Sequence, residues 1–181
     1  GRLPLSKALY DPSAEHQLTG FFATSHLVIG IEFILLSFIV IKIAKLLGSK
    51  LPCLAGALVL FNPSLLGHSF VNAKDIPFAV FYTTYTYTLL LRRTSSRPLL
   101  LVLSILSSSL LISQKYVAFL PVILSEVILI LSQKKCFRDL RSNLALLVSA
   151  PFIALLLQPA AWGLNPFIYI TEAFQTFSNH K

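Results

Sequence analysis

Long apolar blocks separated by short polar clusters run along most of this chain. Most blocks approach the ~20 residues that an α-helix needs to cross the hydrocarbon core of a membrane. The pattern predicts six helical spans, over residues 21–43, 51–61 with 65–70, 76–91, 98–113, 116–132 and 143–157. We therefore expect an all-α fold, a polytopic transmembrane helical bundle.

The segment 167–177 is too short to cross a membrane. Its apolar residues recur at spacings of three and four, which is typical of one helix face: Phe167, Ile170, Phe174 and Phe177. We expect a helix in the membrane interface, with Trp162 in the loop before it. The predicted organisation is a loop tail over 1–20, the helical bundle over 21–160, and a loop with the interfacial helix over 161–181.

Two short connections shape the predicted bundle. Asn62 and Pro63 interrupt the second span, and the pair should end or kink the helix there. The sequence "SQKY", residues 113–116, is the only polar stretch between the fourth and fifth spans, which predicts a tight hairpin of these two helices.

Composition agrees with a membrane protein. Of the 181 residues, 55% are hydrophobic and 12% are charged, and the mean hydropathy is +0.76, whereas about a quarter of a soluble domain is charged. The net charge of +8 does not indicate nucleic-acid binding, because the basic residues lie between the apolar blocks and not along one solvated face. No nucleophile elbow, phosphate-binding glycine loop or HExxH zinc motif is found.

Spans that alternate in direction divide the basic residues unequally between two sides. One side holds ten of the 15 Lys and Arg residues: Lys42, Lys45, Lys50, Arg92, Arg93, Arg97, Lys134, Lys135, Arg138 and Arg141. Because short cytoplasmic loops carry an excess of Lys and Arg, this side is predicted to be cytoplasmic. The polar segment 62–78, "NPSLLGHSFVNAKDIPF", then faces the extracytoplasmic side.

This polar segment holds the first candidates for chemistry. Asp75 stands before Ile76 and Pro77, where an acid caps a helix start, and a functional acid at the mouth of the third span is compatible with this capping role. A capping Asp does not explain Lys74 and His68, which could bind a phosphate headgroup or extend to lipid phosphates.

Three further residues are candidates because of where they lie in the predicted spans. Glu32 and Glu126 fall inside apolar spans, where ionisable groups are costly and usually face the bundle interior. No cation lies one helical turn from Glu126, so its partner cannot be named, and a structural hydrogen bond is as good an explanation as a function. His26 lies near the outer end of the first span, where it could share a cavity with Asp75.

The polar segment resembles a motif of the GT-C glycosyltransferases, in the protein O-mannosyltransferase-like group (glycosyltransferase family 39 and relatives). That motif commonly reads Pro, a few residues, Gly-His, then Asn-x-Lys-Asp-x-Pro. The matching positions here are Pro63, Gly67, His68, Asn72, Lys74, Asp75 and Pro77. More weakly, "SHLV" at His26 resembles the start of the preceding span in that group, and the segment 158–180 resembles its later loop.

The resemblance implies a hexosyltransferase of the bacterial inner membrane, which transfers a sugar with inversion from a polyprenyl or dolichyl phosphate donor on the extracytoplasmic side. It implies that Asp75 is an acid of the catalytic site, organising the donor phosphate or a divalent metal, Mg or Mn. Four other residues are expected to bind the donor phosphate: Lys74, His68, Asn72 and His26. The implied partners are the lipid-linked donor, membrane lipids, and a protein, lipid or glycan acceptor. No nucleic acid is expected.

Two features depart from the family pattern. The family's general base is an acid in the first outer loop, and neither Asp11 nor Glu15 has its usual Asp-Glu context. Because the chain also contains no Met, we expect an internal fragment whose catalytic base lies upstream. After His26, Ile29 and Gly30 followed by Glu32 stand where the family often has an Asn.

Two other classes of function stay open at this point. A transporter or lipid flippase would also carry acids within its spans, although it usually shows internal repeats or helices broken at mid-membrane. A non-catalytic membrane scaffold would explain a site without its base.

Overall fold

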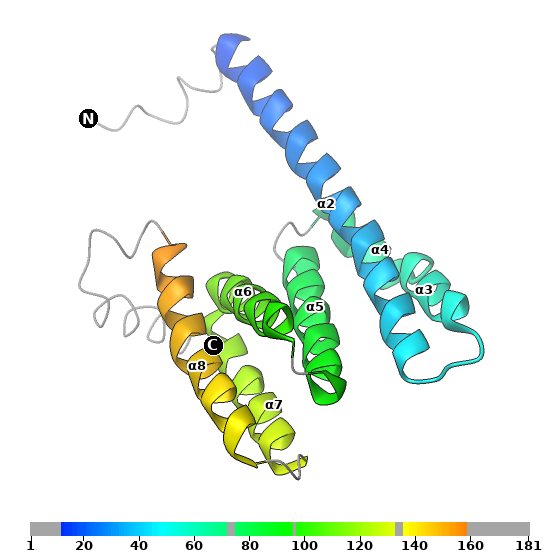
Figure 1. The fold of residues 1–181 in the computed structure, drawn as a ribbon. Helices are drawn as coiled ribbons and strands as arrows, with labels where there is room; N and C mark the ends of the chain where they lie inside the picture. Colours follow the sequence, from blue (N-terminus) through cyan, green and yellow to red (C-terminus); the bar gives the residue numbers. More distant parts are fainter. Residues whose placement is uncertain (1–11, 72–74, 96, 133–135, 159–181) are drawn as a thin grey trace, which may run out of the picture. The chain divides into compact units, whose positions relative to one another are not determined.

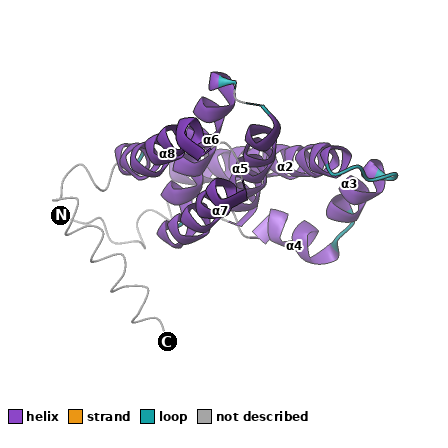
Figure 2. Cartoon of the chain, turned by 60° about the horizontal axis from the view of Figure 1, so that its bottom comes forward, coloured by secondary structure: helices purple, strands orange, loops and turns teal. Residues whose placement is uncertain are grey.

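A computed structural model describes residues 12–71, 75–95, 97–132 and 136–158 of the chain. Every regular element in these ranges is a helix (Figure 1, Figure 2). The all-α prediction is therefore confirmed for the part that the structure describes. The chain divides into two compact units, Gly1–Val80 and Phe81–Lys181.

The first unit is built on the long helix α2, Pro12–Leu46. Proline opens this helix, where its missing N–H leaves no intrahelical hydrogen bond unmade. The part Thr24–Leu46 has 23 residues and is apolar enough to cross a membrane. At 1.5 Å per residue it extends over about 35 Å, more than the ~30 Å of a hydrocarbon core. Among the described helices, this is the one that meets both criteria.

The six predicted spans are not supported by the remaining helices. The apolar helices Pro98–Gln114, Tyr116–Leu131 and Leu140–Leu156 have 10–17 residues each, at or below the lower limit for a crossing. The helix α5, Asp75–Thr94, has 20 residues but fails on composition, since Tyr, Thr and two Arg dilute its apolar residues. The second predicted span is divided into two short helices.

Those two short helices are α3, Pro52–Leu60, and α4, Pro63–Val71, with nine residues each. The predicted interruption at Asn62 is confirmed. The Asn62 Oδ1 accepts hydrogen bonds from the backbone N–H groups of Ser64 at 3.0 Å and Leu65 at 3.1 Å. It thereby caps α4, because an Asn oxygen satisfies N–H groups that have no partner within the helix.

Helix α3 packs closely against α2 through Gly56 (Figure 1). The hydroxyl of Ser37 in α2 donates a hydrogen bond of 3.0 Å to the Gly56 carbonyl. A Cβ atom on Gly56 would lie 2.5 Å from the Cγ1 of Ile41. Small residues at helix contacts of this kind allow close backbone approach, as is common in membrane proteins.

The core of the first unit joins α2 to the first turns of α5. Ile29, Phe33 and Leu36 of α2 form one buried cluster with Ile76 and Val80 of α5. Partly buried residues of α3 and α4 pack against this cluster, among them Val59, Leu60 and Leu65. The helix α4 and the first turns of α5, which carry the polar segment, therefore pack against the same stretch of α2.

The second unit contains α6, Pro98–Gln114; a short 3-10 helix, Tyr116–Ala118; α7, Phe119–Ser132; and α8, Cys136–Leu156. The tight connection predicted between α6 and α7 is present, since only Lys115 and the 3-10 helix separate them. The two helices do not form a closely packed pair, however, because α6 packs chiefly against α8, which also packs against α7. Both α6 and α8 carry small buried residues, which are Ser104 and Ser108 on α6, and Ala150 and Ala154 on α8.

The loop tail predicted over residues 1–20 is helical from Pro12 onward, where α2 begins. The first eleven residues, the predicted interfacial helix over 167–177, and Trp162 lie outside the described residues.

Candidate functional site

Asp75 is the first residue of α5 and is half-buried. The predicted helix start at this position is therefore confirmed. An acid in a first helical turn is stabilised by the partial positive charge of the helix N-terminus. Its predicted roles in binding a donor or a metal are separate from this capping position and stay predictions.

The other predicted site residues lie on or near the elements that meet at the core of the first unit. His68 belongs to α4, whereas Asn72 and Lys74 lie outside the described residues. His26 is exposed on α2, three residues before Ile29 of the buried cluster. The structure thus brings α2, α4 and the start of α5 together.

A divalent metal at Asp75 was an implication of the family resemblance. Within the described ranges, no group of three or more His, Cys, Asp or Glu side chains is placed to hold a metal ion. The described residues alone do not fit a metal site, so we derive no chemical step through a metal.

Glu32 lies in the middle of the apolar part of α2, as predicted. Its Oε2 atom is buried and has no hydrogen-bond partner among the described residues. A buried carboxylate oxygen without a donor is costly, since it has lost water and gained nothing in exchange. This acid therefore differs from Glu126, whose partners the structure shows.

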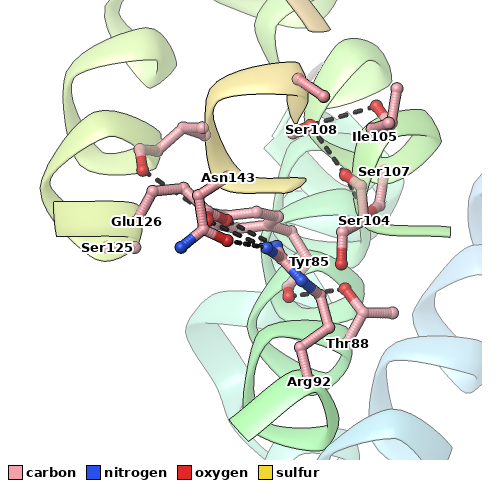
Figure 3. A network of polar contacts seen from close by, with 12 residues as sticks. Tyr85, Thr88, Arg92, Ser104, Ile105, Ser107, Ser108, Ser125, Glu126 and Asn143 are labelled. Atoms are coloured by element: carbon pink, nitrogen blue, oxygen red, sulfur yellow. Dashed lines mark hydrogen bonds and ion pairs between the residues drawn. The ribbon is translucent and has the colours of Figure 1, made fainter. Parts of the chain in front are cut away.

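Glu126 lies at the centre of a buried polar network in the second unit, drawn in Figure 3. The side chain of Glu126 is 0% exposed and that of Arg92 is 8% exposed. Arg92 donates from Nη1 to Glu126 Oε1 at 2.8 Å and from Nη2 to Oε2 at 3.2 Å. This is the bidentate geometry that makes an Arg–carboxylate pair strong.

Two neutral side chains complete the network (Figure 3). The Tyr85 hydroxyl donates to Glu126 Oε1 at 2.9 Å, with the Val122 carbonyl a second acceptor at 3.3 Å. The Oδ1 of Asn143 in α8 accepts a hydrogen bond from Arg92 Nη2, while its buried Nδ2 has no partner in the part of the chain that the structure describes. The four side chains connect α5, α7 and α8.

This network stabilises helix packing and leaves no free acid for catalysis. Each carboxylate oxygen of Glu126 accepts at least one hydrogen bond, and the adjacent guanidinium balances its charge. No cation lies one turn from Glu126 on its own helix. Arg92 lies 34 residues away, in the last turn of α5, where it was assigned to a cytoplasmic loop. Only the packing of α5 against α7 reveals the pair.

Comparisons with protein-family models, with curated proteins and with solved structures find no match to this chain. The likeness to GT-C glycosyltransferases rests on the motif residues of the polar segment and on the weaker matches beside it.

Proposed function

We propose that this chain is part of a multi-pass membrane glycosyltransferase that uses a polyprenyl-phosphate-linked hexose as donor. The donor headgroup binds at the extracytoplasmic ends of α2, α4 and α5. The ordered match of the polar segment to the glycosyltransferase motif supports the substrate class. The membrane-length helix Thr24–Leu46 supports the location.

One structural observation carries most of the proposal. The polar segment is not one long solvated loop, because α4 extends to Val71 and α5 begins at Asp75. Both flanking helices pack against one apolar cluster on α2 through Leu65 and Ile76. A polar segment whose two helices pack on one apolar cluster suits a ligand with a charged headgroup and a hydrocarbon tail, since each part can then meet its preferred surroundings.

The proposed chemistry is a displacement at the anomeric carbon of the sugar. The acceptor oxygen forms a bond to this carbon as the bond to the phosphate oxygen breaks, and the configuration inverts. The leaving phosphate gains negative charge, which the ammonium of Lys74 stabilises. Asp75 organises the headgroup. The proton of the acceptor passes to a general base that this chain's polar segment does not supply.

The alternative of a transporter loses one of its two supporting acids. Glu126 is paired with Arg92 and Tyr85, so it is not a free carboxylate along a translocation path. We therefore retain the glycosyltransferase as the proposed function.

The test is sugar transfer by the full-length gene product in membrane vesicles supplied with undecaprenyl-phosphate-[¹⁴C]mannose. Asp75→Asn should reduce labelled product to background while the amount of protein in the membrane is unchanged. Asp139→Asn, the same chemical change in the first turn of α8, is the matched control and should retain transfer. Equal transfer by both variants would remove Asp75 from the site.

A further inference from the structure

Three lysines surround the point where α2 ends and the chain turns into α3. Lys42 and Lys45 are exposed near the end of α2, and Lys50 is exposed in the connection. Among the described residues, none of the three forms an ion pair. The sequence contains no Asp or Glu between Glu32 and Asp75. The end of α2 therefore carries positive charge that this part of the chain does not neutralise.

The turn between α2 and α3 has a defined backbone geometry. Gly48 has a φ of 79°, in the left-handed region that favours glycine. The N–H of Gly48 donates to the Lys45 carbonyl at 3.0 Å, and the N–H of Ser49 donates to the Ala44 carbonyl at 2.9 Å. These are the paired hydrogen bonds of a Schellman motif, which ends a helix abruptly. Lys50 therefore follows Lys45 through a short, hydrogen-bonded turn.

Beside the lysines, α3 presents large apolar side chains on the face opposite its contact with α2. Gly56 lies on the contact face, where its carbonyl accepts the hydrogen bond of Ser37. Leu51, Leu54 and Leu58, at spacings of three and four, are exposed at 66%, 53% and 65%. Exposed apolar side chains that are grouped and flanked by polar residues mark an interaction site for a protein or a membrane.

The proposed membrane location of α2 places these groups at two depths. The membrane-length part of α2 ends at Leu46, so the three lysines lie where hydrocarbon gives way to headgroups. Lys42 is about 6 Å deeper than Leu46 at 1.5 Å per residue, which a lysine side chain spans by extending toward the headgroups. Gly56 of α3 is bonded to Ser37, about 14 Å from Leu46 along α2. The exposed leucines of α3 therefore lie at the depth of the acyl chains.

We propose that the end of α2 and the exposed face of α3 bind an anionic phospholipid. This lysine–leucine surface consists of Lys42, Lys45, Lys50, Leu51, Leu54 and Leu58. The ammonium groups attract the negative headgroup, and an acyl chain lies along the leucines. A nucleic acid or a free anion would meet the lysines but leave the leucines exposed to water. The inference goes beyond the proposed function, because it involves no sugar and concerns the end of α2 opposite to His26.

The experiment is photocrosslinking of lipids to the full-length gene product in phosphatidylcholine nanodiscs. The probes are phosphatidylglycerol and phosphatidylcholine, each with a diazirine in one acyl chain, added in equal amounts to separate samples. Trypsin cuts after Lys50 and Lys74 and at no residue between them, so the peptide 51–74 reports the labelling of α3. Each lysine beside an anionic lipid surface contributes about fivefold in affinity. Phosphatidylglycerol should therefore label this peptide more than about tenfold as strongly as phosphatidylcholine.

Paired substitutions test which charges are responsible. Lys42→Gln/Lys45→Gln keeps the trypsin site at Lys50 and should lower the labelling ratio by about fivefold or more. Lys42→Arg/Lys45→Arg keeps both charges and should keep the ratio. The matched control is Arg93→Gln/Arg97→Gln, which removes two exposed charges from the second unit and should leave the ratio unchanged. All four side chains are exposed, so the helix content by circular dichroism should equal that of the wild type.

Four results would overturn the lysine–leucine surface. Equal labelling by both lipids in the wild type would indicate lipid contact without recognition of the headgroup. An unchanged ratio in Lys42→Gln/Lys45→Gln would remove these lysines from the surface. An equal fall in the lysine and arginine variants would indicate a general effect of net charge. Absence of label on peptide 51–74 with either lipid would indicate that another molecule covers α3. Because sugar transfer is not measured, each of these results leaves the proposed glycosyltransferase standing.

Discussion

Removing one partner of the Arg92–Glu126 pair should be among the most damaging changes in the second unit. In Glu126→Leu the Arg92 guanidinium, with a side chain 8% exposed, loses both hydrogen bonds to the carboxylate. A buried charge left without its partner costs about 3–5 kcal/mol. The Tyr85 hydroxyl also loses its shorter hydrogen bond, although the Val122 carbonyl remains as an acceptor at 3.3 Å.

The double variant Arg92→Met/Glu126→Leu should be less destabilised than either single charge variant. Neither unpaired charge is left, and replacing a buried pair by apolar side chains is often neutral or stabilising. One cost persists, because the Asn143 Oδ1 loses the Arg92 donor, a loss of about 1–3 kcal/mol for a buried group. The two substitutions should therefore couple by several kcal/mol, and the double variant should recover most of the stability lost in the single ones.

The assay is reversible unfolding of the protein in mixed micelles, followed by circular dichroism as the fraction of denaturing detergent rises. The four species of the double-mutant cycle give the coupling energy directly. Tyr85→Phe removes the hydrogen bond of the Tyr85 hydroxyl and gives the size of one neutral hydrogen bond for comparison with the coupling energy. Hydrogen bonds within membranes average about 0.6 kcal/mol and reach about 1.7 kcal/mol. Additive losses in the double variant would refute the ion pair as the link between α5 and α7.

Two further predictions concern the first unit. Gly56→Ala should destabilise the protein by about 1–3 kcal/mol through overpacking, because the new Cβ would lie 2.5 Å from Ile41 Cγ1. Thermal unfolding in detergent measures this loss. The control Gly30→Ala, with nothing within 4 Å of the added atom, should cost no stability. Asn62→Ala should lower the stability by about 1 kcal/mol, because it removes the cap of α4. Asn62→Asp keeps a capping oxygen and should retain the stability of the wild type. Equal stability of the Ala and Asp variants would contradict the capping role.

Local signals in the sequence predicted several helix boundaries correctly. Pro52 and Pro98 open helices as expected, the break falls at Asn62, and α5 starts at Asp75. Each of these boundaries depends on backbone chemistry within a few residues. Proline lacks an N–H, and Asn or Asp side chains satisfy the first free N–H groups of a helix.

Lateral packing could not be predicted in the same way. The partner of Glu126 is 34 residues distant, and α6 packs chiefly against α8, which follows α7 in the sequence. The six predicted spans are not supported, because among the described helices only Thr24–Leu46 is both long and apolar enough to cross a membrane, and the second predicted span is divided between α3 and α4. The candidate site residues were predicted from the sequence, whereas the packing of α4 and the start of α5 against the same part of α2 is seen only in the structure.

The central claim is that the protein transfers a hexose from a polyprenyl phosphate at the membrane. The most direct measurement is the incorporation of [¹⁴C]mannose from undecaprenyl-phosphate-[¹⁴C]mannose into product, by vesicles that contain the wild-type full-length protein and by vesicles that lack it. The account predicts labelled product only where the protein is present, with release of undecaprenyl phosphate in equal amount. Intact donor and no labelled product in both preparations would contradict it.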